Sequence, residues 1–346
     1  MDTKNHSNLA VTVVKPLKKE AKTMKKSILS SAIMVIVAFT ANAQKDTIYI
    51  WKSGAVIKIQ PIVNIRCLKT TDVDSITFYK PIPKSKNINI SLVSIPSGTF
   101  TMGSPADEVN HEIEHQVRLS AFQMSKYEIT NMQFAAFLNA KGIGSDGKDV
   151  AGTYPTEALI YASDENHDWG LHYTNGKWIP VTGYEKNPVI NVTWYGASEF
   201  ATYVGCELPT ESQWEYACRA NTTTAYNTGA CLSNTQANYS WDHPQTGCTN
   251  TNTKAPGTTQ PVGSYPANAF GLYDMHGNVW EWCSDWFNSY PTSTQTNPKG
   301  SASGSYRVFR GGSWYYISRY CRSAFRNGYY PNNSNNSLGF RIVLGF

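Results

Sequence analysis

The last third of this 346-residue chain limits its possible folds more than any other feature. Beyond residue 220 no long stretch has helical periodicity, and more than 120 residues consist of Gly-, Asn- and Pro-rich loops with aromatic segments between them. Loops of that length need covalent staples or bound ions to stay ordered. We therefore expect a rigid, loop-rich domain rather than a helical bundle or a disordered chain.

Regular secondary structure is predicted mainly before residue 220. Strand signals in INISLVSIPSGTFTMGS and HQVRLSAFQMSKYEIT flank a polar, acidic loop at residues 104–114. Three segments have helical patterns: NMQFAAFLNA after the N-cap Thr130, VTWYGASEFATYVG, and LPTESQWEYACRA, in which Thr210 and Gln213 form a capping box. These elements predict one continuous domain over residues 88–346.

Composition and charge give no support for a nucleic-acid partner. Only 16% of the residues are charged and 13% are aromatic. The formal net charge is +5, and residues 1–43 carry all of it, because seven lysines there face only Asp2 and Glu20. The rest of the chain is close to neutral, which gives no basis for a nucleic-acid partner.

The N-terminal region has the layout of a secretory signal peptide. From Met24 two lysines precede a short apolar stretch, and the A-x-A cleavage site ANA ends at Ala43, so that Gln44 begins the mature chain. The apolar stretch is shorter than the ~20 residues of a membrane-spanning helix; an uncleaved anchor is the alternative. We interpret residues 1–43 as an upstream extension and signal peptide, and expect export to the periplasm or the extracellular space without a membrane span.

A short module is predicted at residues 44–87. The segment Asp46–Gln60 alternates apolar and polar residues around the turn KSG, which predicts a β-hairpin, and Asp74–Lys80 predicts a further strand. Two prolines and a polar run then indicate a linker at residues 81–87. The module is too small to bury a core of its own.

The seven cysteines are an odd number, so at least one stays unpaired. In an oxidising compartment they are disulfide candidates, and the absence of C-x-x-C spacing disfavours a zinc site built on paired cysteines. Cys231 and Cys248 share one polar, Asn- and Thr-rich segment, and we expect a disulfide to close it. Cys67 is expected to stay free, and Cys206 and Cys283 remain unassigned.

Seven segments resemble, in the same order, the formylglycine-generating enzyme or sulfatase-modifying factor domain family. They span roughly residues 92–346, about three quarters of the chain. The resemblance implies the C-type-lectin-like α+β fold of that family, with little regular secondary structure, preceded here by the small β-rich module. The segments are IPSGTFTMGS, KYEITNMQFAAFLN, VTWYGASEFATY, LPTESQWEYACRA, GLYDMHGNVWEWCSDWF, RVFRGGSW and SLGFRIV.

The resemblance implies copper chemistry only if the family's cysteines are present. Its oxidases convert a sulfatase cysteine to formylglycine with O₂, and hold Cu(I) between two thiolates that follow a Gly-Gly-Ser motif. Counted from Ser313, the first thiolate position is Tyr316 and the second is Cys321. A phenol does not replace a soft thiolate for Cu(I). We therefore expect no copper site, and Cys321 is the catalytic candidate if the chain is active.

A second alignment gives Cys321 another role. Aligned backwards from SLGFR, Cys321 falls at the family's structural cysteine, whose partner position is Cys218. The resemblance thus implies a Cys218–Cys321 disulfide, and a lone redox-active Cys321 is the alternative.

The resemblance also implies one Ca²⁺ site in the segment YDMHGNVWEW. Its donors are the Asp274 side chain, the carbonyls of Gly277 and Val279, and the Glu281 carboxylate; such an all-oxygen set suits a hard cation. The alternative is that the two carboxylates only cap loops. The family's other calcium site is degraded, because Lys254 falls near the position where an aspartate is expected.

A peptide-binding groove is the last feature that the resemblance implies. Aromatic residues of this kind are also commonly part of a core, and that alternative stays open. The expected lining residues are Trp280, Ser313, Trp314, Tyr316, Arg326, Asn336 and Ser337.

Two functions from different classes follow. In the first, the chain is an exported, non-oxidase member that binds a peptide or protein in the groove and is stabilised by one Ca²⁺. In the second, it is an active formylglycine-generating oxidase. The missing thiolate pair favours the first.

Overall fold

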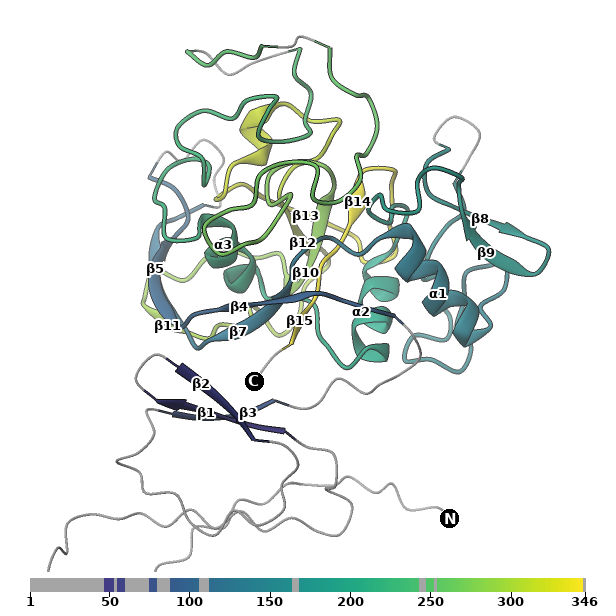
Figure 1. Ribbon diagram of the computed structural model, residues 1–346, viewed down its shortest axis with the longest axis horizontal. Coiled ribbons are helices and arrows are strands. Elements are labelled where there is room, and N and C mark those ends of the chain that lie inside the picture. The colour runs from purple at the N-terminus through teal and green to yellow at the C-terminus, as the bar shows by residue number, and fades with distance from the viewer. Residues whose placement is uncertain are drawn as a thin grey trace, which may run out of the picture. The chain divides into compact units, whose positions relative to one another are not determined.

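The computed structural model (Figure 1) describes residues 47–52, 55–59, 75–79, 88–105, 112–163, 168–242, 247–251 and 254–344. The chain divides into two compact units, one from Met1 to Pro81 and one from Ile82 to Gly345. The signal peptide, Cys67 and the linker at residues 81–87 lie outside the described residues, and so do their predictions.

The N-terminal unit contains a three-stranded antiparallel sheet in the order β2-β1-β3. Strand β1 (Thr47–Lys52) pairs with β2 (Ala55–Ile59) from Lys52↔Ala55 to Ile48↔Ile59, which confirms the predicted hairpin. Strand β3 (Ser75–Tyr79) pairs with the other edge of β1 and lies within the segment predicted as a further strand.

The second unit contains the three predicted helices, which are α1 (Asn131–Lys141), α2 (Trp194–Tyr203) and α3 (Glu211–Arg219). Threonines at positions 130, 193 and 210 cap their first turns, and the first and third form capping boxes with a glutamine. Helix α1 ends at Gly142, whose φ of 69° suits glycine at a C-cap. After residue 220, the described part of the chain has only the 3₁₀ turn η2 (Ser318–Cys321) as helical structure.

Small sheets connect segments that are distant in sequence. Their orders are β13-β12-β10-β14, β11-β6-β5, β15-β7-β4 and β8-β9. Figure 1 shows β10, β12 and β13 in the middle of the unit, with α1 and α2 on one side. The strands are β4 (Leu92–Ile95), β5 (Gly98–Met102), β6 (His115–Leu119), β7 (Phe122–Ser125), β8 (Leu171–Thr174), β9 (Lys177–Pro180), β10 (Trp280–Trp286), β11 (Gln295–Thr296), β12 (Arg307–Arg310), β13 (Arg326–Tyr329), β14 (Leu338–Gly339) and β15 (Val343–Leu344).

The hydrophobic core of the second unit brings together residues from early and late in the chain. Trp214 and Cys218 of α3 pack with Val308 of β12, Cys283 of β10 and apolar residues of β4 to β7. Around the start of α1, the rings of Phe134, Phe137, Phe200 and Phe340 contact one another with centroids 5.4–5.9 Å apart. These contacts confirm an α+β fold with little regular secondary structure. No helix among the described residues is long and apolar enough to cross a membrane.

The long region after residue 220 is held by a disulfide and by buried side-chain bonds. Cys231 and Cys248 form a disulfide with Cα atoms 5.6 Å apart, the pair predicted from the sequence. Beside it, Tyr239 donates a hydrogen bond to the Leu232 carbonyl, and the same hydroxyl group is 2.8 Å from Asn250 Oδ1. The loop thus has both the covalent staple that its length requires and a small core of its own.

Candidate functional site

One surface of the second unit carries a continuous set of aromatic rings, which we call the aromatic face. Strands β12 and β13 pair Phe309 with Asn327 and Arg307 with Tyr329. Because side chains alternate along a strand, these residues point outward while Val308 and Arg310 point into the core. The aromatic face comprises Trp169, Trp280, Phe309, Trp314, Tyr315, Tyr316, Tyr320 and Tyr329.

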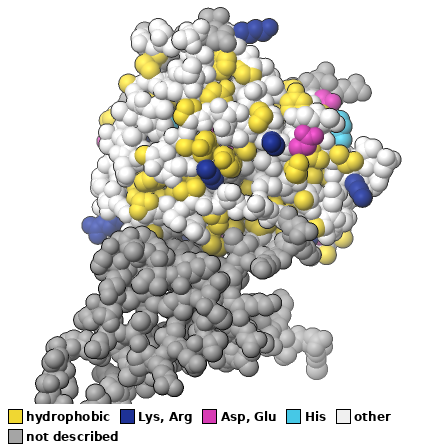
Figure 2. All heavy atoms as spheres, in the orientation of Figure 1, with side chains coloured by type: hydrophobic (Ala, Val, Ile, Leu, Met, Phe, Trp, Pro, Cys, Tyr) yellow, Lys and Arg dark blue, Asp and Glu magenta, His cyan; other side chains and the backbone are white. Residues whose placement is uncertain are grey.

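The rings of the aromatic face support one another. Tyr316 contacts Trp280, Tyr315 and Tyr320 edge to face, with centroids 5.4–5.6 Å apart. Trp314 links Tyr315 to Trp169 at similar distances. Tyr315 is the outermost ring, with 66% of its surface exposed. On the side of the domain seen in Figure 2, few charged side chains are visible among polar and hydrophobic ones.

The structure brings most of the predicted groove residues together, but it buries many of them. Trp280 N–H donates to the Ser337 carbonyl, and Trp314 Nε1–H donates to the Asn336 carbonyl. Tyr316 and Asn336 are partly exposed, whereas Trp280, Trp314, Ser313 and Ser337 are buried beneath the surface. The accessible part of the site is therefore more aromatic than the predicted set.

Arg326 does not line the surface as predicted. The residue is only 5% exposed, and its guanidinium forms a forked ion pair with Glu211 of α3, with both N–O distances 2.7 Å. Its third nitrogen donates to the Asn288 carbonyl. Arg326 occupies the inner side of β13, opposite to Asn327 and Tyr329, so it supports the aromatic face from below.

A buried ion network lies under β12 and β13. Arg310 of β12 pairs with Glu215 of α3, which also pairs with Arg219. The same guanidinium donates to the carbonyls of Ser323, Ala324 and Phe325. The network thus attaches the two strands, and the chain between them that carries Tyr315 and Tyr320, to α3.

Asp285 of β10 is buried at the edge of this network. Its Oδ2 accepts hydrogen bonds from Glu211 N–H and from the Ser284 hydroxyl group. Burial, and after it the negative charge of Glu211, raise the pKa of Asp285 to about 7. In an unfolded chain the pKa of an aspartate is about 3.9.

Asp285 should therefore make stability fall as pH rises. The contribution of the protonated Asp285 carboxyl group to folding stability is fully present below about pH 4. It is lost as pH rises through 7, because the folded protein then holds a buried charge. At pH 8 we expect the free energy of unfolding of Asp285→Asn, measured with urea, to exceed that of the wild type by up to about 4 kcal/mol. At pH 4.5 this difference should be lost. Asp146→Asn, at an exposed aspartate, should change neither value; parallel pH profiles for Asp285→Asn and wild type would contradict the role of Asp285.

The positions expected to hold copper do not suit it. Tyr316 stands at the first, and its hydroxyl group has a raised pKa because of burial and neighbouring tyrosines. Cys321 at the second is fully buried, and burial raises the pKa of its thiol far above its usual range. Because the first position has a phenol in place of a soft thiol and the second is a buried cysteine, the pair of thiolates that Cu(I) takes is incomplete, and the residues present do not fit it.

The predicted Cys218–Cys321 disulfide is wrong for this structure, in which both are free and buried. Their sulfur atoms have different partners. Cys218 Sγ lies 3.6 Å from the Met275 carbonyl oxygen and 3.7 Å from Ser323 Oγ. Cys321 Sγ lies 4.0 Å from the Ile317 carbonyl oxygen and packs closely against Gly312.

Three buried carboxylates meet at the segment predicted to bind Ca²⁺: Asp274 and Glu281 belong to the segment, and Glu128 comes from outside it. Glu281 is bound by Arg341 through two nitrogens, at 2.6 and 2.7 Å, and its Oε2 also accepts Trp214 Nε1–H. Asp274 accepts one hydrogen bond from a described residue, which Gly263 N–H donates to its Oδ2. Burial raises the pKa of Asp274 to about 6 and that of Glu128 well above its usual range, and Glu281 adds to both shifts.

The donor set still suits a hard cation. Asp274 Oδ1 accepts no hydrogen bond among the described residues, and Glu281 Oε1 accepts one, so both retain lone pairs. In the described part of the chain, no three His, Cys, Asp or Glu side chains converge on one ion. A cation here would therefore need the carbonyls of Gly277 and Val279, as the resemblance implies.

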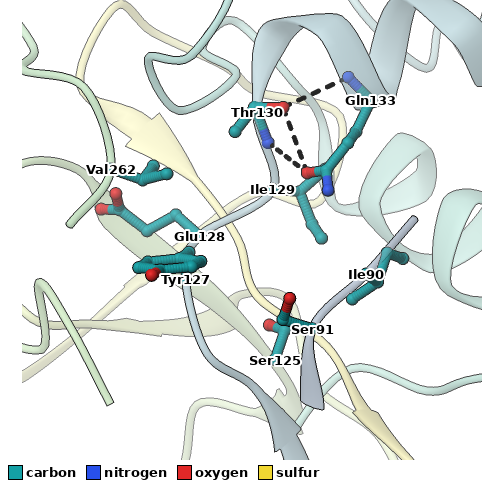
Figure 3. Close-up of a pocket in the computed structure, with 9 residues that line it drawn as sticks. All are labelled: Ile90, Ser91, Ser125, Tyr127, Glu128, Ile129, Thr130, Gln133 and Val262. Atoms are coloured by element: carbon teal, nitrogen blue, oxygen red, sulfur yellow. Dashed lines mark hydrogen bonds between the residues drawn. The ribbon is translucent and has the colours of Figure 1, made fainter. Parts of the chain in front are cut away.

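A small pocket of about 30 Å³ lies beside Glu128, where the chain passes from β7 to α1 (Figure 3). Ser91, Ser125 and Gln133 give it polar walls. Figure 3 shows the Glu128 side chain extending toward Val262, away from Ile90. The pocket is large enough for water but not for a peptide side chain.

Two solved structures have a fold similar to that of this chain. The chain is similar to Treponema denticola variable protein 1, with a TM-score of 0.55 and 24% identity over 74% of this chain and 95% of that one. It is also similar to PvdO from Pseudomonas aeruginosa, with a TM-score of 0.54 and 25% identity over 75% and 96% of the two chains.

The chain belongs to the sulfatase-modifying factor family, because residues 78–345 match the model of the sulfatase-modifying factor enzyme 1-like domain. It is 31% identical to the formylglycine-generating enzyme of Bos taurus over 76% of each chain. It is 33% identical to that of Streptomyces coelicolor over 72% of this chain and 88% of the relative. It is also 36% identical to the serine/threonine-protein kinase pkn1 of Chlamydia caviae over 76% of this chain, but spans only 39% of that relative.

The sequence did not reveal three parts of the site. Glu128 was not predicted, although it stands in the quoted motif KYEITN, because nothing in that motif shows which loop its carboxylate reaches. Arg341 in SLGFR was likewise not recognised as the partner of Glu281. Tyr329 was also missed, because RNGY does not alternate apolar and polar residues and only the structure shows that Tyr329 is partly exposed.

Proposed function

We propose that this protein is a non-oxidase member of its family that binds a peptide or a protein segment on the aromatic face. The observation that carries the proposal is the pair of side chains at the expected thiolate positions, a tyrosine that forms part of an exposed ring cluster and a fully buried cysteine. The residues that copper chemistry needs are missing, while a broad surface is present at the same place.

The chemistry of the aromatic face favours a polypeptide partner. Tyr and Trp supply large contact areas with few rotatable bonds, and ring contacts hold them in place before binding, which lowers the entropic cost of association. Asn327 and the Asn- and Ser-rich segment 332–336 lie partly or fully exposed in the same part of the chain. Aromatic anchors beside adaptable amides and hydroxyls are typical of surfaces that bind proteins.

Export and one Ca²⁺ are part of the same proposal. The layout of residues 24–44 supports secretion to the periplasm or the extracellular space, and the Cys231–Cys248 disulfide suits an oxidising compartment. For Ca²⁺, the support is the oxygen donor set of Asp274, Gly277, Val279 and Glu281 together with the surplus of buried carboxylates around it.

Selection from a displayed random-peptide library tests the binding function. We expect peptides enriched on the mature protein to lose at least about tenfold in affinity on Tyr315→Ser and on Tyr329→Ser, because truncating a central aromatic contact commonly costs 2 kcal/mol or more. The matched control is Met132→Ser, which removes an exposed apolar side chain from α1. A library that yields no binder, or binders that treat all three variants like the wild type, would contradict the aromatic face as the binding site.

A further inference from the structure

We propose that Arg307 of β12 binds a carboxylate group of the polypeptide partner. This inference rests on the proposed function, because it assigns one contact to the partner of the aromatic face. Arg307 adjoins that face, since it points outward two residues before Phe309 and pairs with Tyr329 of β13. The partner then carries an acidic side chain or a free C-terminus next to the segment that covers the rings.

Arg307 differs from the buried arginines of this chain in having no acidic partner. Each of the five buried arginines that the structure describes forms an ion pair with a glutamate. The pairs are Arg219–Glu215, Arg310–Glu215, Arg322–Glu112, Arg326–Glu211 and Arg341–Glu281. Arg307 is half-buried, but no carboxylate of a described residue lies within ion-pair distance of it. A charge that is partly removed from water without a counter-ion is unfavourable, so this one favours an acidic group from outside the chain.

Two indole rings cover the faces of the Arg307 guanidinium. Its central carbon lies 3.8 Å from the ring centre of Trp194 and 3.4 Å from that of Trp286. At these distances the rings stack flat on the guanidinium, one on each face, and attract its charge. Trp194 is itself held in place, because its Nε1–H donates to the Cys283 carbonyl at 2.8 Å. The plane of the guanidinium is therefore fixed, and a ligand can reach only its edge.

One edge of the guanidinium is occupied and the other is open. Nη1 of Arg307 donates to the Ser284 carbonyl at 2.6 Å. Nε is buried but has no hydrogen-bond partner, and no described residue accepts a hydrogen bond from Nη2. Nε and Nη2 together form a pair of parallel donors, which matches the two oxygens of a carboxylate. Because a buried donor without a partner is costly, a carboxylate in the plane of the guanidinium would satisfy both nitrogens at once.

Two tyrosines beside Arg307 add neutral donors. The rings of Tyr154 and Tyr195 lie 4.8 Å apart, and neither hydroxyl group makes a hydrogen bond to a described residue. Burial lowers the pKa of Arg307 to about 10, although the neighbouring Tyr154 and Tyr195 raise it, so the guanidinium stays charged at neutral pH. The site thus offers an anion one unpaired cation and two free hydroxyl groups. A planar carboxylate suits the space between two stacked rings better than a tetrahedral sulfate or phosphate does.

Paired substitutions in the protein and the peptide test the inference. Peptides selected on the full mature protein are synthesised with each Asp or Glu replaced by its amide, and with the C-terminus as acid or as amide; fluorescence polarisation gives each Kd. For the wild type we expect one carboxylate whose replacement raises the Kd at least about tenfold, because hydrogen bonds between charged groups are the strong ones. For Arg307→Gln the acid and amide forms should bind within about twofold of each other. If Arg307 only packs between the indoles, its loss weakens both forms equally and the preference for the acid stays, which would overturn the inference.

Controls separate the inference from the function on which it rests. Arg118→Gln removes the same charge from an exposed position on β6 and should keep the preference for the acid. If the selected peptides bind with no dependence on a carboxylate, the role of Arg307 is overturned while the aromatic face stands; if no peptide binds, both are overturned. A phosphoserine at the same peptide position that binds more tightly than the carboxylate would overturn the choice of anion. Should Arg307→Gln not fold, Arg307→Lys replaces it: it keeps the charge but not the parallel donors, and an acid preference equal to that of the wild type would overturn the inference.

Discussion

Arg310→Met should destabilise the second unit by about 3–5 kcal/mol, because it removes one partner from a fully buried ion pair and leaves the other behind. Arg310 has no exposed surface, and its loss would leave Glu215 with Arg219 alone. It would also leave the carbonyls of Ser323, Ala324 and Phe325 without the donor that now binds them. Since domains of this kind are stable by about 5–15 kcal/mol, the variant would be marginal at 25 °C.

Urea unfolding measures this effect, and the chain offers a matched control. Arg319→Met removes an exposed arginine from the same C-terminal segment, and should change stability by no more than about 0.5 kcal/mol. An Arg310→Met protein within about 1 kcal/mol of the wild type would show that the network does not hold β12 and β13 to α3.

The helices show how much local sequence determines. Thr130 with Gln133, and Thr210 with Gln213, predicted helix starts that the structure confirms, because a capping box is complete within four residues. The Cys231–Cys248 disulfide was also predicted, since both cysteines lie in one short segment that has little else to order it. In these cases the interacting groups are close in sequence.

The ion pairs show why the rest was not predictable. Glu211 and Arg326 are 115 residues apart, and nothing near either one indicates the partner. The family resemblance placed Arg326 in contact with a peptide, although the residue is buried under β13. The Cys218–Cys321 pairing failed for a related reason. A resemblance in motif order brings two cysteines into one neighbourhood, but side-chain direction decides between a bond and separate partners, and here the sulfur atoms point to different carbonyls.

We expect that this protein does not convert a sulfatase-type cysteine to formylglycine. The family's oxidation needs two protein thiolates to hold Cu(I), and the two positions hold Tyr316 and Cys321. Cys321 is a free thiol, which is the one observation that favours the oxidase alternative. Cys321 is nevertheless fully buried, which raises the pKa of its thiol and keeps the sulfur out of reach of a peptide.

Mass spectrometry of a Cys-x-Pro-x-Arg peptide, incubated with Cu(I), O₂ and the mature protein, is the decisive measurement. The formylglycine-generating enzyme of Streptomyces coelicolor, one of the relatives, serves as the positive control. Because each missing soft ligand weakens Cu(I) binding by orders of magnitude, turnover should be undetectable. Tyr316→Cys alone should not restore it, since the sulfur of Cys321 lies packed against Gly312 inside the core. Formylglycine produced by the unmodified protein, and lost on Cys321→Ser, would establish the oxidase instead and make Cys321 its catalytic thiol.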